Sequence, residues 1–438
     1  MTQSNKIPNN ITTNLNDINT YKINADGYYG ANNDFGGSFI PPMLQDPLDE
    51  LTKAFEKYKN DPDFLTELDF YQRNFIGRPS PLIFAKNLTE QLGGAKIYLK
   101  NEGANLTGAH KINHCLYQAL LAKRMGKTEV VCETGAGQHG IACATVCAKF
   151  GLKCTIYMGA IDIARQYPNV FFMKQLGAEV ISVESGNKGL SEAVDEAFGD
   201  FINNPHKYFM VGSAVGPYPY PEIMRAGQKI ISQEIFTQIQ QLEGQKPDYI
   251  IACIGGGCNA IGAFNEYLTD TDVKLIGVEA GGTSIAIKGQ HASRIASGQG
   301  EIAVEQGFKS IFLLNQNKSR SLTQSICAGL NYFGIGPIHA YLHSIGRIQI
   351  VAQEDYKVVS AFQRLAKTEG LIGALESCHA VAEAIDLAPK LSKDQIIIVN
   401  LSGRGDAYLF NIAKALQDQE FKNFINFINQ QAKLNIDV

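Results

Sequence analysis

Residues 107–113 read Thr-Gly-Ala-His-Lys-Ile-Asn, a polar turn that leads into an amphipathic pattern of apolar residues. This pattern predicts a helix from Ile112 to Arg124, with Lys111 at its start and His110 beside that lysine. Around and after this stretch, short apolar runs alternate with longer helical patterns. Such alternation is typical of parallel sheets that are covered by helices on both faces.

Eight apolar runs are predicted to form strands. They are Ile97–Leu99, Glu129–Cys132, Cys154–Met158, Val180–Val183, Tyr208–Val211, Tyr249–Ile254, Leu275–Val278 and Ile396–Val399. The predicted helices are Ile112–Arg124, Ile141–Phe150, Val170–Leu176, Leu190–Ile202, Tyr220–Gln240 and Ala260–Leu268. Gly126, Gly151 and Gly177 follow three of these helices, where a left-handed cap would end them. We therefore predict an α/β fold with two doubly wound, mostly parallel sheets.

Length and charge limit the classes of protein. The chain has 438 residues, which predicts two domains, 1–227 and 228–438. Its 39 basic and 43 acidic residues give a net charge of -4, and no Lys/Arg-rich run is present, which argues against nucleic-acid and membrane partners. The N-terminal segment is polar and lacks the apolar core of a signal peptide, so a cytoplasmic location is expected.

The nine cysteines are dispersed along the chain. They stand at positions 115, 132, 143, 147, 154, 253, 258, 327 and 378, without a CxxC pair or a zinc-ligand spacing. Most of them lie in apolar runs, where buried free thiols are the expected state. The sequence predicts no metal site and a reducing compartment.

Three polar or glycine-rich turns follow predicted strands. They are Glu133–Gly140, Gly255–Asn259 and Ser402–Asp406. In parallel sheets, ligands bind beyond the carboxyl ends of the strands, where such turns enter the next helix. The three turns are therefore expected to converge on one site.

The residue types in these turns indicate a chemistry. A lysine amine in a desolvated pocket can attack an aldehyde, and Lys111 is the candidate. The consecutive N–H groups of Gly255–Asn259 suit a phosphate. Together they indicate pyridoxal phosphate, with Glu133 as an acid/base group and Thr134–Gln138 as donors to a substrate carboxylate. Each residue also has an alternative interpretation without chemistry. Lys111 would be a surface lysine, and Gly255–Asn259 and Thr134–Gln138 would be plain turns. Glu133 would be a charge at the start of the following helix.

From about Tyr28 to Asp406 the chain resembles the tryptophan synthase β subunit family, which are fold-type II pyridoxal phosphate enzymes. The matching strings are GRPSPL, TGAHKIN, LLAKRMGKT, ETGAGQHG, the Gly151–Gly159 run, GAEV, PYPE, GGGCNA, TEG, ALES and NLSGRGD. The resemblance implies a mobile subdomain at about 126–213.

The resemblance also implies roles for single residues. Lys111 corresponds to the catalytic lysine that bonds to the cofactor, and Glu133 corresponds to the catalytic acid/base at the indole nucleophile. The implied cofactor-binding residues are His110, Gly255, Gly256, Gly257, Cys258, Asn259, Glu376 and Ser402. The implied substrate-binding residues are Thr134, Gly135, Ala136, Gln138, His139 and Arg165.

The reaction that the resemblance implies is a β-replacement, which condenses indole with L-serine or a related donor to give L-tryptophan or an analogue. It further implies a homodimer, an α-subunit partner and a monovalent cation. The family's closing-loop Asp is missing from Asn315–Ser321, although Arg165, its usual partner, remains. This departure puts the α-subunit partnership in doubt.

Other functions therefore stay open at this point. Lys318 and Arg320 make the altered loop basic, which suggests O-phosphoserine as a donor. A serine or threonine dehydratase, or a β-replacement enzyme with a different acceptor, would keep the cofactor and change the reaction. A third alternative is a non-catalytic regulatory homologue.

Overall fold

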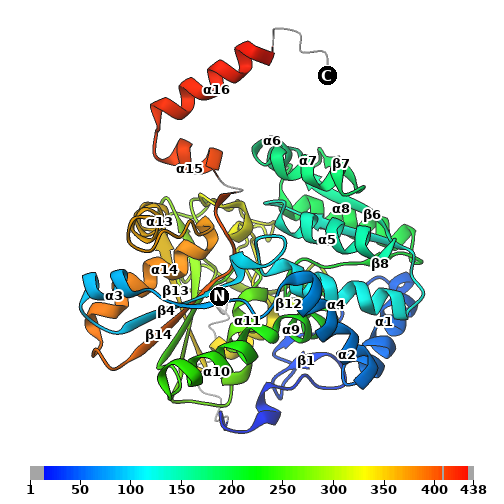
Figure 1. Ribbon diagram of the computed structural model, residues 1–438. Helices are drawn as coiled ribbons and strands as arrows, with labels where there is room; N and C mark the ends of the chain where they lie inside the picture. Colours follow the sequence, from blue (N-terminus) through cyan, green and yellow to red (C-terminus); the bar gives the residue numbers. More distant parts are fainter. Residues whose placement is uncertain (1–13, 407–408, 433–438) are drawn as a thin grey trace.

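The computed structural model describes residues 14–406 and 409–432 (Figure 1). The largest sheet has six strands in the order β13-β10-β9-β14-β4-β3. Its strands are β13 (Ile348–Glu354), β10 (Lys274–Gly282), β9 (Tyr249–Cys253), β14 (Ile396–Leu401), β4 (Lys96–Asn101) and β3 (Leu82–Phe84). Only the β3–β4 pair within this sheet of the described chain is antiparallel.

A second parallel sheet has four strands in the order β7-β6-β5-β8. They are β7 (Glu179–Val183), β6 (Lys153–Gly159), β5 (Glu129–Thr134) and β8 (Tyr208–Phe209). A small antiparallel sheet, which the sequence did not predict, joins β1 (Tyr28–Tyr29), β2 (Phe35–Gly36), β12 (Phe308–Phe312) and β11 (Glu301–Glu305). The two parallel sheets confirm the predicted fold class.

Helices surround the sheets. They are α1 (Gln45–Tyr58), α2 (Pro62–Tyr71), α3 (Lys86–Leu92), α4 (Lys111–Arg124), α5 (Gln138–Phe150), α6 (Ala160–Arg165), α7 (Tyr167–Gln175), α8 (Leu190–Asn203), α9 (Tyr220–Gln228), α10 (Ile230–Glu243), α11 (Cys258–Phe264), α12 (Pro337–Ser344), α13 (Asp355–Glu369), α14 (Leu375–Leu387), α15 (Leu409–Ala415) and α16 (Gln419–Ala432). Figure 1 shows α15 and α16 extending away from the rest of the chain. No helix among the described residues is both long and apolar enough to cross a membrane.

All eight predicted strands are present, and Gly126, Gly151 and Gly177 adopt the predicted left-handed conformation. The single helix predicted for Tyr220–Gln240 is wrong, because Lys229 separates α9 from α10. No proline and no side-chain cap accounts for this interruption.

The helix that carries Lys111 differs from its prediction in burial. The sequence pattern predicts an amphipathic helix, yet every residue from Ile112 to Ala122 is buried. Because α4 packs against both α5 and α9, it has no solvent face over this span. Burial on all sides is typical of a helix in the centre of a large protein.

Strands from both halves of the chain share the six-stranded sheet, since β4 pairs with β14, which follows residue 228, and β3 joins the sheet through β4. The predicted subdomain at about 126–213 contains the whole four-stranded sheet. Its motion and the division at residue 228 stay predictions.

Candidate active site

One cavity of about 970 Å³, counting the space that opens to solvent, lies where the predicted turns meet. The turns after β5, β9 and β14 all contribute to its wall, as the sequence predicts. The lining includes Lys111, Glu133, Thr134, Gly135, Ala136, Gln138, His139, Gly255, Gly256, Gly257, Cys258, Asn259, Glu376 and Ser402, together with His110. Cavities of this size and lining hold small organic ligands.

Lys111 begins α4, so its side chain enters the cavity from the N-terminal end of a buried helix. Its Nζ donates a hydrogen bond to the Gly212 carbonyl oxygen and lies 3.4 Å from the Cys258 sulfur. The amine is therefore held between Gly212, which follows β8, and Cys258, which follows β9.

The turn Gly255–Asn259 forms a backbone cradle in which neighbouring atoms leave no room for side chains at Gly256 and Gly257. A Cβ atom on Gly256 would lie 2.4 Å from the Ser213 hydroxyl, and one on Gly257 would lie 2.2 Å from the His339 ring. Gly257 also has a φ of +94°, which side chains disfavour. Because α11 begins at Cys258, within this turn, the N–H groups at its start suit an anion such as the cofactor phosphate.

Cys258, the first residue of α11, lies against the basic side chains of His110 and Lys111. Its sulfur is 3.2 Å from His110 Nε2 and 3.4 Å from Lys111 Nζ. Burial raises the pKa of the Cys258 thiol, but Lys111 and His110 together hold this pKa well below its ordinary value. The surroundings of the thiol therefore favour a negatively charged group. The same surroundings would favour a bound phosphate.

Ser402 follows β14, the sheet neighbour of β9, and its hydroxyl-bearing side chain lines the cavity. Its Oγ lies 2.9 Å from Ser377 Oγ and 3.7 Å from Cys253 Sγ. Glu376, on α14, accepts a hydrogen bond from the Gly329 N–H. The residues present therefore fit pyridoxal phosphate, which Lys111, Ser402 and the Gly255–Asn259 cradle would hold.

Glu133 lies near the end of β5 and is 5% exposed. Its Oε1 accepts a hydrogen bond of 2.8 Å from the Gly212 N–H, whereas Oε2 has no partner among the described residues. Burial raises the pKa of the Glu133 carboxyl, although His139 and the Gly212 N–H oppose this shift. A carboxyl with a raised pKa can hold a proton and return it near neutral pH.

The substrate wall is the turn from Thr134 to His139, and all five predicted residues of this turn line the cavity. The backbone after β5 enters α5, whose N-terminus begins at Gln138. Arg165, the sixth predicted residue, is exposed at the end of α6 and is not among the cavity-lining residues. The structure thus keeps the turn together but does not bring Arg165 to it.

The basic loop residues are paired outside the cavity. Lys318 contacts Glu301, and its side chain is 70% exposed. Arg320 contacts Asp195 of α8 and lies 3.2 Å from Glu305. Neither lines the cavity, so this structure gives no support to a phosphate-bearing donor held by the loop.

Gly212 is the site residue that sequence reasoning missed. Its N–H binds Glu133 and its carbonyl oxygen binds Lys111, so one residue joins the two catalytic candidates. The turn Gly212-Ser213 follows the predicted strand Tyr208–Val211, and the rule that located the other three turns could have found it.

Comparisons with known proteins agree with this geometry. The family described as "Pyridoxal-phosphate dependent enzyme" matches residues 74–403. The "Tryptophan synthase beta chain" of Fusobacterium nucleatum subsp. nucleatum is 51% identical over 397 residues, covering 90% of this chain and 99% of that protein. Its counterpart from Methylibium petroleiphilum is 46% identical over 397 residues, covering 90% and 95%.

Two solved structures share the fold. A threonine deaminase from T.th. superposes with a TM-score of 0.58 at 17% identity, covering 82% of this chain and 97% of that one. Maize serine racemase superposes with a TM-score of 0.58 at 18% identity, covering 82% and 99%. The chain belongs to the pyridoxal-phosphate dependent enzymes and, among them, to the tryptophan synthase β chain family.

Proposed function

We propose that this protein is a lyase that joins indole to L-serine to give L-tryptophan and water. One observation carries the proposal. Lys111 and Glu133 meet at Gly212 inside a cavity that is also lined by an anion cradle. Relatives that are 46% and 51% identical and bear the name tryptophan synthase beta chain support the same reaction.

Pyridoxal phosphate supplies, when bound, an aldehyde that holds the amino acid and a ring that withdraws electrons from it. Lys111 Nζ would hold the cofactor through that aldehyde, and its free amine would move a proton at the substrate Cα. The N–H groups of Gly255–Asn259 would hold the phosphate, and Ser402 Oγ would bind the ring. A hydroxyl at the ring nitrogen favours loss of the serine β-hydroxyl over prolonged carbanion chemistry.

The substrate side of the cavity performs the second half of the reaction. The backbone N–H groups of the Thr134–His139 turn bind the amino-acid carboxylate. Glu133 binds the indole N–H and takes up the proton that indole loses when its carbon bonds to the substrate Cβ. A raised pKa lets this carboxyl exchange the proton without leaving a permanent buried charge.

The competing functions find less support. The dehydratase alternative was suggested by the missing loop Asp. The solved structures of a threonine deaminase and a serine racemase are 17% and 18% identical, and such likeness shows the fold alone. O-Phosphoserine would need Lys318 or Arg320 in the cavity, and both are paired elsewhere. A non-catalytic homologue would not need Lys111 and Glu133 to converge.

We further propose a cytoplasmic homodimer that turns over without a second chain. The missing loop Asp in Asn315–Ser321 supports independence from an α subunit. The name "beta chain" of the relatives instead supports a partner chain. Turnover with and without an added tryptophan synthase α chain, alongside light scattering, tests both points. A monovalent cation stays a prediction, which turnover in sodium, potassium and caesium salts would test.

The decisive experiment incubates the purified protein with L-serine, with and without indole, and follows product mass. We expect tryptophan only when indole is present and little pyruvate without it. In parallel, borohydride reduction and peptide mass spectrometry are expected to find the pyridoxyl group on Lys111. A pyridoxyl group elsewhere, or pyruvate as the main product in both reactions, would contradict the proposal.

A further inference from the structure

A buried arginine lies behind the cradle Gly255–Asn259. Arg294 is in the loop after β10, and its side chain is fully buried. Its Nη2 donates to the carbonyl oxygens of Ile254 and Gly255, each at 3.0 Å, and its Nη1 donates to the Tyr332 carbonyl oxygen at 3.1 Å. Gly255 and Tyr332 line the cavity, whereas Arg294 is not among the lining residues. One guanidinium group therefore joins two segments of the cavity wall from outside.

An ion pair holds this arginine in place. Glu279 of β10 is fully buried, and its Oε1 lies 3.0 Å from Arg294 Nε. Its Oε2 accepts hydrogen bonds from the Ser293 hydroxyl at 2.7 Å and from the N–H groups of Ile295 and Ala296 at 3.0 Å. An arginine keeps its charge in proteins, and the carboxylate balances that charge in the interior. The loop is thus fixed on both sides of Arg294.

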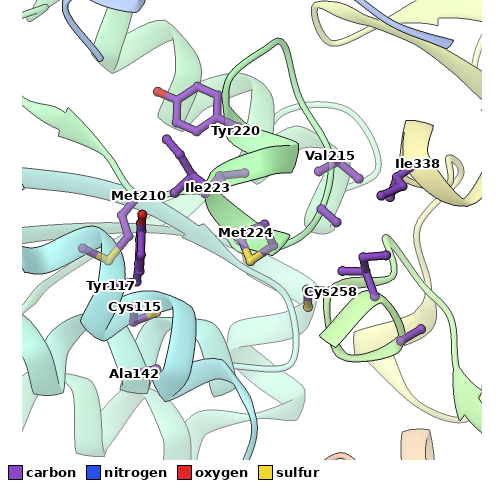
Figure 2. Close-up of a cluster of buried hydrophobic side chains, with 14 of the residues drawn as sticks. Cys115, Tyr117, Ala142, Met210, Val215, Tyr220, Ile223, Met224, Cys258 and Ile338 are labelled. Atoms are coloured by element: carbon purple, nitrogen blue, oxygen red, sulfur yellow. The ribbon is translucent and has the colours of Figure 1, made fainter. Parts of the chain in front are cut away.

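His339 of α12 holds the other end of the cradle. Its ring is buried, and its Nε2 lies 2.7 Å from the Gly257 carbonyl oxygen. Burial lowers the pKa of His339 to about 4, so the ring is neutral near neutral pH and Nε2 carries the proton that it donates to this carbonyl. Figure 2 shows Ile338, the residue before His339, in the same buried cluster as Cys258 of the cradle. The ring therefore supports the cradle from the side of α12.

The direction of the carbonyl groups fixes the direction of the N–H groups. In a trans peptide, the C=O of one residue and the N–H of the next point in opposite directions, and the peptides of the cradle are trans. Arg294 and His339 bind the carbonyls from outside the cavity. The N–H groups that follow these carbonyls, those of Gly255, Gly256 and Cys258, therefore point towards the cavity, which these three residues line. Among the described residues, these N–H groups have no acceptor.

We propose that Arg294 and His339 are positioning residues for the phosphate of the cofactor. They hold the carbonyl oxygens of the cradle away from the phosphate, which those oxygens would repel, and they keep the N–H groups directed at it. Both act through the backbone, since neither side chain lines the cavity. This inference rests on the proposed phosphate-binding role of the cradle, but it does not depend on which amino acid or nucleophile reacts.

The test compares the affinities of the apo-protein for pyridoxal phosphate and for pyridoxal, which lacks the phosphate. R294K keeps a charge beside Glu279, but one ammonium group does not replace the planar fork of donors that holds the carbonyls. The preference for pyridoxal phosphate is the ratio of the two Kd values from equilibrium dialysis. In R294K this preference should fall about 10- to 100-fold, which is the effect of losing one hydrogen bond to a charged group. Other differences between the two aldehydes cancel when the ratio is compared between variants.

The matched control is R347K, which alters a second buried arginine. Arg347 donates to four backbone carbonyl oxygens at 2.6–3.1 Å, those of Tyr267, Leu268, Asp270 and Val273. These residues precede β10, whereas Arg294 follows it. Urea denaturation is expected to show comparable losses of stability in R294K and R347K. The preference for pyridoxal phosphate should be unchanged in R347K, because Arg347 does not contact the cradle.

A second pair of variants tests the other support of the cradle and does not require R294K to fold. H339A removes the donor to Gly257 and should lower the preference about tenfold. H339Q keeps an N–H donor and should retain more of the preference than H339A. An unchanged preference in folded R294K or folded H339A would overturn the inference.

The same measurements separate this inference from the proposed function. If the unaltered protein binds pyridoxal as tightly as pyridoxal phosphate, the cradle does not hold the phosphate, and the inference fails with it. If the preference falls in R294K and H339A but the protein forms no tryptophan, the inference stands and only the proposed reaction is overturned.

Discussion

Two buried glutamates show how differently the two parallel sheets treat the same side chain. Glu102 follows β4 of the six-stranded sheet and is 0% exposed, and Glu133 lies in β5 of the four-stranded sheet and is 5% exposed. Arg78 donates to both oxygens of Glu102, at 2.8 and 2.9 Å. The Gly212 N–H binds one oxygen of Glu133, and the other has no partner among the described residues.

The two environments move the pKa in opposite directions. Burial raises the pKa of the Glu102 carboxyl, but Arg78, Lys100 and Ser80 outweigh it and hold the pKa well below its ordinary range. Burial also raises the pKa of Glu133, and there the opposing groups are too weak to reverse it. A paired buried carboxylate is structural, whereas an underpaired one is suited to proton transfer.

The largest expected effect is on turnover. E133Q keeps the shape of the side chain and removes its acid/base function, so kcat for tryptophan formation should fall about 10²- to 10⁴-fold. The control is E129Q on the same strand, where Glu129 forms a partly exposed pair with Lys153 and turnover should be unchanged. Equal turnover of E133Q and the unaltered protein would remove Glu133 from the mechanism.

The second effect is on stability. E102Q leaves the buried Arg78 with Glu234 as its remaining described acidic partner, and the free energy of unfolding should fall by about 3–5 kcal/mol. Urea denaturation measures this change. E50Q, at a partly exposed pair with Lys127, is the control, with an expected change of about 0–1 kcal/mol. A comparable loss of unfolding free energy in E102Q and E50Q would show that the buried pair with Arg78 stabilises the fold no more than a surface pair does.

The third effect is a pair of opposite pH dependences. The lowered pKa of Glu102 contributes stability above the ordinary value of 4.5, and this contribution is lost as pH falls below it. The raised pKa of Glu133 has the reverse sign, since stability is lost as pH rises from 4.5 towards the folded value.

Urea denaturation across this pH range measures both dependences. The deficit of E102Q relative to the unaltered protein should therefore shrink in acid. The stability of E133Q should instead rise relative to the unaltered protein as pH increases. Parallel curves for the two variants would contradict the contrast between the glutamates.

The smallest effect belongs to an ion pair near the surface. Arg320 and Asp195 have side chains that are 30% and 46% exposed, so R320A should change the free energy of unfolding by only about 0–1 kcal/mol. If R320A instead alters the choice between serine and O-phosphoserine by more than about tenfold in kcat/KM, the loop acts on the substrate. Such a result would reopen the donor that the structure disfavours.

Local pattern was enough to locate most of the candidate site. The turns after β5, β9 and β14 were predicted because a strand, a polar turn and a helix are consecutive in the sequence, and all three line the cavity. Arg165 was placed by resemblance alone, and it lies outside the cavity lining. The antiparallel sheet escaped prediction because two of its strands have only two residues each, too few for a periodic pattern.

The sequence by itself determined which segments carry chemistry, since Lys111, the glycine cradle and Ser402 stand in local contexts that fix their positions at strand ends or helix starts. Only the tertiary structure decided what the buried groups do. Glu102 finds Arg78 at a separation of 24 residues, Gly212 joins Glu133 and Lys111 at separations of 79 and 101, and Cys115 meets Cys143 at 28. Charge pairing and hydrogen bonding depend on distances of a few ångströms between such remote segments, and local sequence does not encode those distances.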